Sequence, residues 1–108
     1  MQAENVVQSL AALAHPVRLQ IFRALVVTGR QGLVPGVIQE ALGIAPATLS
    51  FHLKELAASG LVTQERASRN LVYRAAYEQM NQLLGYLTDN CCQGAACAAD
   101  GLAVARAC

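Results

Sequence analysis

Apolar residues recur at helical spacing up to about residue 60, alternate with polar ones between about residues 61 and 75, and return to helical spacing after that. The helical spacing first predicts two helices, over residues 3–14 and 16–27. The second is apolar on most faces, so we expect it at the buried centre of the domain. Pro16 is well placed as its first residue, and Gly29 is expected to end it.

Two further helices with a short, glycine-containing connection follow. Pro35 opens a helix of about two turns that Gly43 ends. Its expected inward positions are Val37, Ile38, Ala41 and Leu42. Pro46 opens a helix that Gly60 ends. The apolar face of this helix is formed by Leu49, Leu53 and Leu56, at spacing i, i+4, i+7.

Alternation then predicts two strands, over 61–66 and 71–75, with a turn at 67–70 between them. A last helix is expected from about residue 76 to residue 90. Its apolar positions are spaced three and four apart: Tyr77, Met80, Leu84, Leu87 and Cys91. Such a seam suits packing against another helix, including one from a second subunit.

This order of elements predicts the fold class. It is α+β and mostly helical, a winged helix-turn-helix with about five helices and a two-stranded β-hairpin wing. Residues 1–90 would form a DNA-binding and dimerisation domain, and residues 91–108 a cysteine-bearing C-terminal tail. The chain has 108 residues, which suits one domain.

The helix over 46–60 would read bases with its outward residues, as recognition helices do. Thr48 and Ser50 can hydrogen-bond to bases, and Phe51 can meet a thymine methyl group. Lys54 is better placed for phosphate. His52 is expected at the margin of this face, and the wing would add Arg66 and Arg69. The alternative is an ordinary helical pair with Phe51 in the core.

Charge and composition change this picture little. The net charge is +1, but the stretch from His15 to Arg74 carries seven basic against three acidic residues. A basic middle points weakly to a polyanionic partner. No apolar run approaches a membrane span, and the first residues do not resemble a signal peptide. We therefore expect a cytoplasmic protein whose thiols stay reduced.

Three segments carry a resemblance: "LAALAHPVRLQIFRAL", "SFHLKELAASGLVTQER" and "NLVYRA". Together they resemble the ArsR/SmtB family of metal-sensing winged-helix repressors, from about residue 5 to residue 90. The resemblance implies a homodimer, a palindromic operator in double-stranded DNA and release on effector binding, not an enzyme. Applied position by position, it implies DNA contacts from Thr48, Ser50, Phe51, His52, Lys54, Arg66 and Arg69.

The two common sensor sites of that family are missing here. Many arsenic repressors carry Cys-Val-Cys in the helix before the recognition helix, where this chain has "GVIQEAL". The family's zinc sensors use histidine and acidic ligands on the last helix, which here offers only Glu78 and Asp89. What remains is the thiol cluster after that helix, which resembles an arsenite-responsive branch with C-terminal cysteines.

That cluster consists of Cys91, Cys92 and Cys97, and Cys108 ends the chain. A disulfide is disfavoured in a reducing compartment, and a redox centre lacks C-x-x-C spacing and a helix N-terminus. Structural zinc rarely uses adjacent cysteines. Trivalent arsenic or antimony, which takes three thiolates in a pyramid, fits the soft ligands better. Four incidental or merely buried cysteines are the plainer interpretation.

We therefore expect an arsenite- or antimonite-responsive repressor whose effector As(III), or Sb(III), binds Cys91, Cys92 and Cys97. On an intact helix, adjacent residues point about 100° apart, so Cys91 and Cys92 converge only where the helix frays. Two thiols would suffice for a methylated arsenical. The cysteines would also suit a repressor of the same fold that senses zinc or cadmium, or a thiol-based redox or metal-handling protein.

Overall fold

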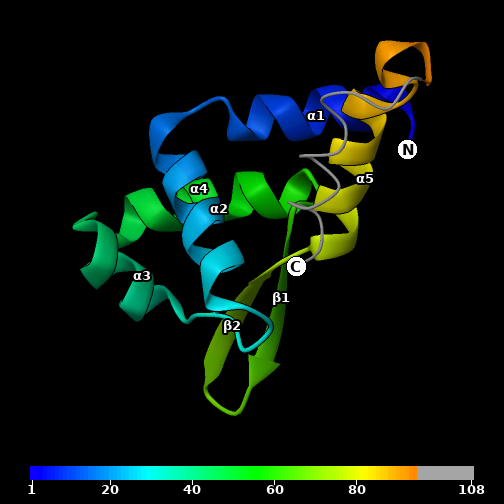
Figure 1. Ribbon diagram of the computed structural model, residues 1–108. Helices are drawn as coiled ribbons and strands as arrows, with labels where there is room; N and C mark the ends of the chain where they lie inside the picture. Colours follow the sequence, from blue (N-terminus) through cyan, green and yellow to red (C-terminus); the bar gives the residue numbers. More distant parts are fainter. Residues whose placement is uncertain (95–108) are drawn as a thin grey trace.

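The computed structural model describes residues 1–94 of the chain (Figure 1). The α-helices are α1 (Ala3–Leu13), α2 (Pro16–Thr28), α3 (Pro35–Leu42), α4 (Pro46–Ala58) and α5 (Tyr77–Thr88). The strands are β1 (Val62–Ala67) and β2 (Asn70–Ala75), and a short 3₁₀ turn spans Cys91–Gly94. Element order and fold class are those predicted: a mostly helical winged helix-turn-helix.

Local sequence explains where the helices begin and end. α2, α3 and α4 each begin with a proline, whose fixed φ suits a first helical position. His15 caps α2, because its Nδ1 accepts a hydrogen bond of 3.1 Å from the Val17 amide. Gly43 ends α3 in the left-handed conformation, at φ 64°, which gives the sharp turn into α4. No side chain caps α4 at Ala45.

The core lies where α2 packs against α3, α4 and the base of the wing. Its fully buried aliphatic side chains are Ile21, Leu25, Ile38, Leu49, Leu56 and Leu61. The leucine repeat predicted for α4 is therefore confirmed. The inward face predicted for α3 is wrong in part, since Val37 and Ala41 are exposed. α3 is only two turns long and buries a single side chain, Ile38.

The prediction that α2 is buried on most faces is also wrong in part. Leu19 and Val27, two turns apart, are both exposed, and Arg23 lies between them on the same face. The opposite face carries the core residues Ile21, Phe22 and Leu25. α2 therefore contacts most of the other elements, but only one of its faces is buried.

The wing is an antiparallel hairpin in which Val62 pairs with Ala75 and Ala67 with Asn70. Ser68 forms its two-residue turn with a positive φ of 61°. The loop before α3 is fastened to this hairpin, because Leu33 and Tyr73 exchange backbone hydrogen bonds of 2.8 and 2.9 Å. The base of the wing and the helix-turn-helix thus form one packed unit.

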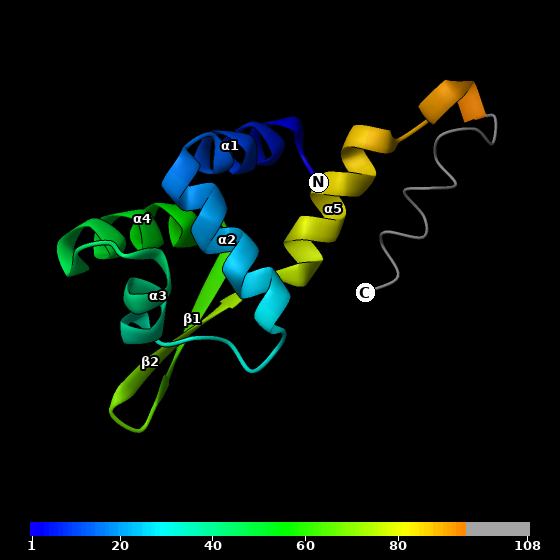
Figure 2. The ribbon, with the colours of Figure 1, turned by 60° about the vertical axis from the view of Figure 1, so that its left-hand side comes forward.

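α5 leaves this unit and leans away from it (Figure 2). It is fastened near its start, where the Tyr77 hydroxyl donates to the Val26 carbonyl at 3.0 Å. Two residues later the Gln79 amide donates to the buried Ser9 hydroxyl of α1 at 3.2 Å. Leu83 is the buried position of α5.

The seam predicted for α5 is wrong at its last position, Cys91. Tyr77 and Met80 pack against the core, and Leu87 is 55% exposed in the protomer, so its packing against a second subunit stays a prediction. Cys91 is not on the helix, which ends at Thr88 instead of residue 90. The predicted end at residue 90 is thus two residues too late, but the helix stops before the cysteines as expected.

No single helix within residues 1–94 is long and apolar enough to cross a membrane. α1 and α2 meet the criterion only as a pair, and they are bent by 103° at their junction.

Candidate nucleic-acid interface and thiol cluster

One face of α4 carries the side chains that the sequence predicted to meet DNA. Thr48, Ser50 and Lys54 are exposed, and Phe51 is 56% exposed. Their helical spacing places them on the side opposite the buried leucines. Phe51 is therefore not a core residue, and an ordinary helical pair with a buried phenylalanine is excluded. The face offers two hydroxyls, one ring and one cation.

His52 does not belong to this face. Its side chain is only 6% exposed, and its Nδ1 lies 3.3 Å from Nη1 of Arg18 on α2. The expectation that it points outward at the margin of the helix is wrong. His52 lies four residues before Leu56, and this i, i+4 spacing places both side chains on the core side of α4.

The environment of His52 lowers its pKa from the ordinary value of 6.5. Burial is the largest cause, and the neighbouring His15 and Arg18 act in the same direction. Glu55 opposes them and raises the pKa of His52. The imidazole ring of His52 also lies 4.5 Å from that of His15, centroid to centroid. The lowered pKa favours the neutral form of His52 at neutral pH.

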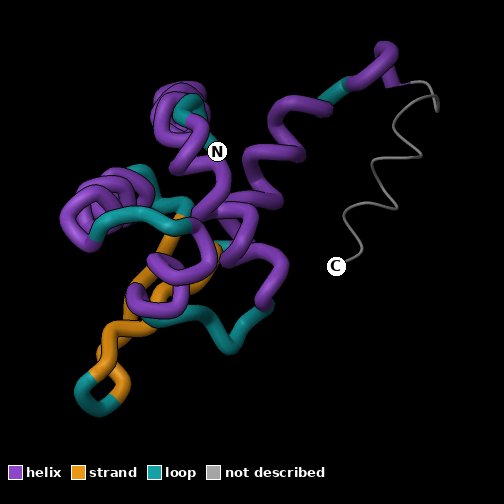
Figure 3. Tube along the Cα trace, turned by 90° about the vertical axis from the view of Figure 1, so that its left-hand side faces the viewer, coloured by secondary structure: helices purple, strands orange, loops and turns teal. Residues whose placement is uncertain are grey.

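The wing presents two exposed cations and a third that is held in an ion pair. Arg66 and Arg69 are exposed, Arg69 within the turn of the hairpin. Arg74 instead forms an ion pair with Glu65 at 2.8 Å, and its Nε donates to the Arg30 carbonyl at 2.7 Å. The wing tip projects beyond the helices, on the opposite side of the molecule from the end of α5 (Figure 3).

At the end of α5 the chain leaves helical geometry. Asn90 and Cys92 have positive φ values of 57° and 55°. This backbone brings the sulfur atoms of Cys91 and Cys92 to 3.6 Å from each other. Two sulfurs bound about 2.3 Å from one ion lie roughly 3.3–3.8 Å apart for bond angles of about 90–110°. The observed separation of 3.6 Å falls within that range. Cys97 and Cys108 lie outside the described residues.

Within residues 1–94 no group of three histidine, cysteine or acidic side chains could hold a metal ion. His15 has a structural role instead, as the N-cap of α2. Arg18 is a functional candidate that the sequence alone did not indicate. The "HPVR" segment was part of the family resemblance, but nothing in its spacing showed that the arginine would reach α4.

Comparisons with known proteins agree with this arrangement. A model described as a helix-turn-helix domain matches residues 13–65. The chain is 37% identical over 83 residues to the HTH-type transcriptional regulator NmtR of Mycobacterium tuberculosis, covering 76% of this chain and 66% of that protein. It is 34% identical over 86 residues to the biofilm growth-associated repressor of Xylella fastidiosa, covering 80% and 73%.

Solved structures that resemble this chain are also transcriptional regulators. An ArsR-like transcriptional regulator from Rhodococcus sp. RHA1 superposes with a TM-score of 0.70 at 26% identity, covering 78% of this chain and 76% of that one. A homodimeric winged helix-turn-helix DNA-binding domain from Mycobacterium bovis has a TM-score of 0.63 at 28% identity, covering 87% of each chain. These relatives are regulators, not enzymes. The chain belongs to the ArsR/SmtB family of winged-helix transcriptional regulators.

Proposed function

We propose that this regulator is a repressor that binds a palindromic operator in double-stranded DNA as a homodimer and leaves it when As(III) or Sb(III) binds. Residues 1–90 would form the DNA-binding and dimerisation domain, and residues 91–108 the tail that carries thiols. The single observation that carries the effector half of this proposal is the 3.6 Å separation of the Cys91 and Cys92 sulfurs.

The DNA half is supported by the exposed face of α4 and by the wing. Thr48, Ser50 and Phe51 occupy the N-terminal half of α4, the part of a recognition helix that meets base edges. Lys54, Arg66 and Arg69 are exposed cations without a partner among the ion pairs of residues 1–94. They are suited to phosphate, which fixes register without reading sequence. His52 is left out of this set because it is buried.

Dimerisation is supported by apolar side chains that the protomer leaves uncovered on α1 and α5. Val7 is 64% exposed, and Leu10 lies one turn further along α1. Tyr86 and Leu87 are exposed near the end of α5. α1 and α5 contact each other through Gln79 and Ser9, so the four side chains lie on neighbouring elements. A second copy would bury them, and the M. bovis relative is described as homodimeric.

The effector half rests on thiol chemistry. Soft thiolates select soft, thiophilic ions. Cys91 and Cys92 would supply two ligands, and Cys97 the third. A methylated arsenical needs only two thiolates, so the Cys91–Cys92 pair gives specific support to that effector as well. Both versions require reduced cysteines, the state that the cytoplasm maintains.

Release would act through α5. Tyr77 and Gln79 fasten the start of α5 to α2 and α1, whereas its last turn carries the uncovered Leu87. Closing the cysteines on one ion would reshape the chain next to that last turn, at the proposed dimer contact. A rotation of one protomer against the other would then move the two α4 helices away from successive major grooves.

The test is binding of a fluorescein-labelled duplex that contains the DNA upstream of its own coding sequence, followed by fluorescence anisotropy. Tight binding at low protein concentration and release by sodium arsenite are expected. Methylarsenite, zinc chloride, cadmium chloride and hydrogen peroxide are added in parallel. Release by zinc or by peroxide, but not by arsenite, would replace the arsenic proposal by a divalent-metal or redox sensor. Failure to bind any such duplex would remove the repressor itself.

A further inference from the structure

Arg18 connects the helix at the proposed dimer contact with the recognition helix. Its Nε donates a hydrogen bond of 2.6 Å to the Ala12 carbonyl in the last turn of α1. Its Nη1 lies 3.3 Å from Nδ1 of His52, halfway along α4. One guanidinium group on α2 therefore reaches both α1 and α4.

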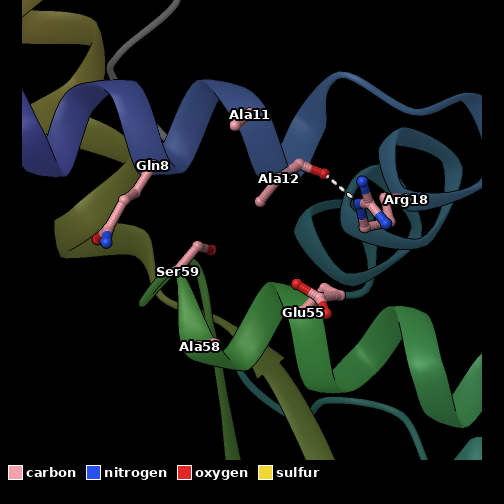
Figure 4. Close-up of a pocket in the computed structure, with 7 residues that line it drawn as sticks. All are labelled: Gln8, Ala11, Ala12, Arg18, Glu55, Ala58 and Ser59. Carbon is pink, nitrogen blue, oxygen red and sulfur yellow. Dashed lines mark hydrogen bonds between the residues drawn. The ribbon is translucent and has the colours of Figure 1, made fainter.

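The space beside this link is not filled by interlocking side chains. A cavity of about 300 Å³ lies between α1 and α4 (Figure 4). Its walls are largely short side chains, and Arg18 lies at one end of it. The residues that line it are Gln8, Ala11, Ala12, Arg18, Glu55, Ala58 and Ser59. Interlocking side chains normally fix the angle between two packed helices. Because the cavity interrupts such packing between α1 and α4, the contacts of Arg18 with Ala12 and His52 are left to define how α4 lies against α1.

The link depends on the protonation state of His52. A guanidinium group only donates hydrogen bonds, so Nδ1 of His52 must be the acceptor and must carry no proton. The charged groups around this ring are His15 at the start of α2, Arg18 on α2 and Glu55 on α4. A proton on Nδ1 would remove the acceptor and place a second cation beside Arg18.

We propose that Arg18 and His52 are positioning residues for DNA recognition: together they set the orientation of α4 relative to α1, and neither contacts DNA. This inference rests on the proposed function. It assigns to His52, which the family resemblance counts among DNA contacts, a role on the opposite face of the same helix. It also gives His15, the first residue of "HPVR", a role. As the N-cap of α2, His15 fixes the start of the helix that carries Arg18.

The first test uses Arg18→Lys, which keeps the positive charge but not the forked donor geometry. Affinity for the upstream duplex is expected to fall roughly tenfold, the effect of losing one hydrogen bond to a charged group. The slope of log affinity against log salt should stay at the wild-type value, because no phosphate contact is lost. Sedimentation should show an unchanged dimer. Unchanged affinity, or a slope reduced by about 1, would overturn the proposal.

The second test uses His52→Asn and His52→Leu. The Asn amide oxygen can accept from Arg18 as Nδ1 does but does not titrate, whereas Leu cannot accept. Wild-type affinity at fixed salt is expected to decrease, relative to the Asn variant, as the pH falls from about 6.5 towards 5. At pH 7.5 the Asn variant should bind within about threefold of wild type and the Leu variant roughly tenfold more weakly.

These results separate the inference from the function on which it rests. Equal binding by the Asn and Leu variants, or identical pH profiles for wild type and the Asn variant, would overturn the positioning role while wild type still binds DNA. If Arg18→Lys fails to fold by circular dichroism, the two His52 variants decide. A wild-type protein that binds no duplex would instead contradict the proposed function.

Discussion

The two ends of the molecule are built in opposite ways. The end that would meet DNA, formed by α3, α4 and the base of the wing, is fastened to α2 by fully buried aliphatic side chains and by the Leu33–Tyr73 bridge. The end that carries Cys91 and Cys92 lies beyond the last buried residue of α5, Leu83. There the apolar side chains are exposed and the backbone leaves helical geometry.

This difference matches what each end would have to do. A surface that reads bases must hold its side chains in a fixed geometry, which buried packing provides. A sensor must change when an ion binds, so it belongs where few contacts resist rearrangement. The link between the two ends runs through Tyr77 and Gln79, which join α5 to the helices of the packed end.

The largest effect expected from this comparison is on folding. Leu53 is 2% exposed at the packed end, and Leu53→Ala should lower the free energy of unfolding by about 2–5 kcal/mol. Leu87→Ala, at the exposed end, should cost the folded protomer far less. Urea denaturation at several protein concentrations measures both, since a dimer contributes a concentration-dependent part. Equal losses for the two variants at every concentration would contradict the comparison.

The next effect is on assembly. Leu87→Asp places a charge in the proposed dimer contact and should raise the dimer dissociation constant by about tenfold or more, equivalent to about 1.4 kcal/mol. Val37→Asp is the matched control, because Val37 is 48% exposed on α3, away from α1 and α5. Analytical ultracentrifugation separates them. Dimers that survive Leu87→Asp but not Val37→Asp would move the interface to a different helix.

A smaller effect is expected on DNA electrostatics. Lys54→Ala and Arg69→Ala should each reduce the slope of log affinity against log salt by about 1, because each lost phosphate contact releases one counterion fewer. Arg74→Ala should leave the slope unchanged, since that guanidinium is held by Glu65 and the Arg30 carbonyl. Anisotropy titrations over a series of KCl concentrations provide the slopes. A reduced slope for Arg74→Ala alone would place the phosphate contact at the base of the wing.

The smallest effect is the pH dependence of stability at His52. Its pKa is lowered in the folded state, so the unfolded chain binds the proton more readily. The contribution of His52 to the free energy of unfolding is therefore fully present above its unfolded-state pKa of about 6.5. It is lost as the pH falls below that value, because the unfolded chain takes up the proton first. Urea unfolding between pH 7.5 and 5 should show the loss in wild type and a flatter profile for His52→Asn. Parallel profiles for the two proteins would mean that His52 titrates normally.

Local patterns were sufficient to predict most of the fold. Prolines at the first helical positions, the leucine spacing of α4 and the alternation in the wing each act over a few residues. The wrong predictions concern burial, which depends on the elements that pack against a helix and not on its own sequence alone. Val37 has the spacing of a core residue, but the short α3 buries only Ile38.

The candidate site was predictable to a similar extent. Thr48, Ser50, Phe51 and Lys54 follow from the helix face, because the buried leucines leave that side outward. His52 and Arg18 could not be assigned in this way. Their contact joins residues 34 positions apart and depends on how α2 crosses α4. The approach of the two sulfurs likewise depends on positive φ values at Asn90 and Cys92, which periodicity does not encode.

The central claim is that thiols at the exposed end control DNA binding at the packed end, and one measurement tests it most directly. Anisotropy with the upstream duplex gives the dissociation constant with and without sodium arsenite for wild type, Cys91→Ser, Cys92→Ser, Cys97→Ser and Cys108→Ser. Arsenite should weaken wild type and Cys108→Ser by a factor of about 5–150, the usual range of allosteric coupling. The other three variants should bind DNA normally and ignore arsenite. Release of Cys91→Ser at the wild-type arsenite concentration would contradict the claim, and release of Cys97→Ser alone would reduce the site to Cys91 and Cys92.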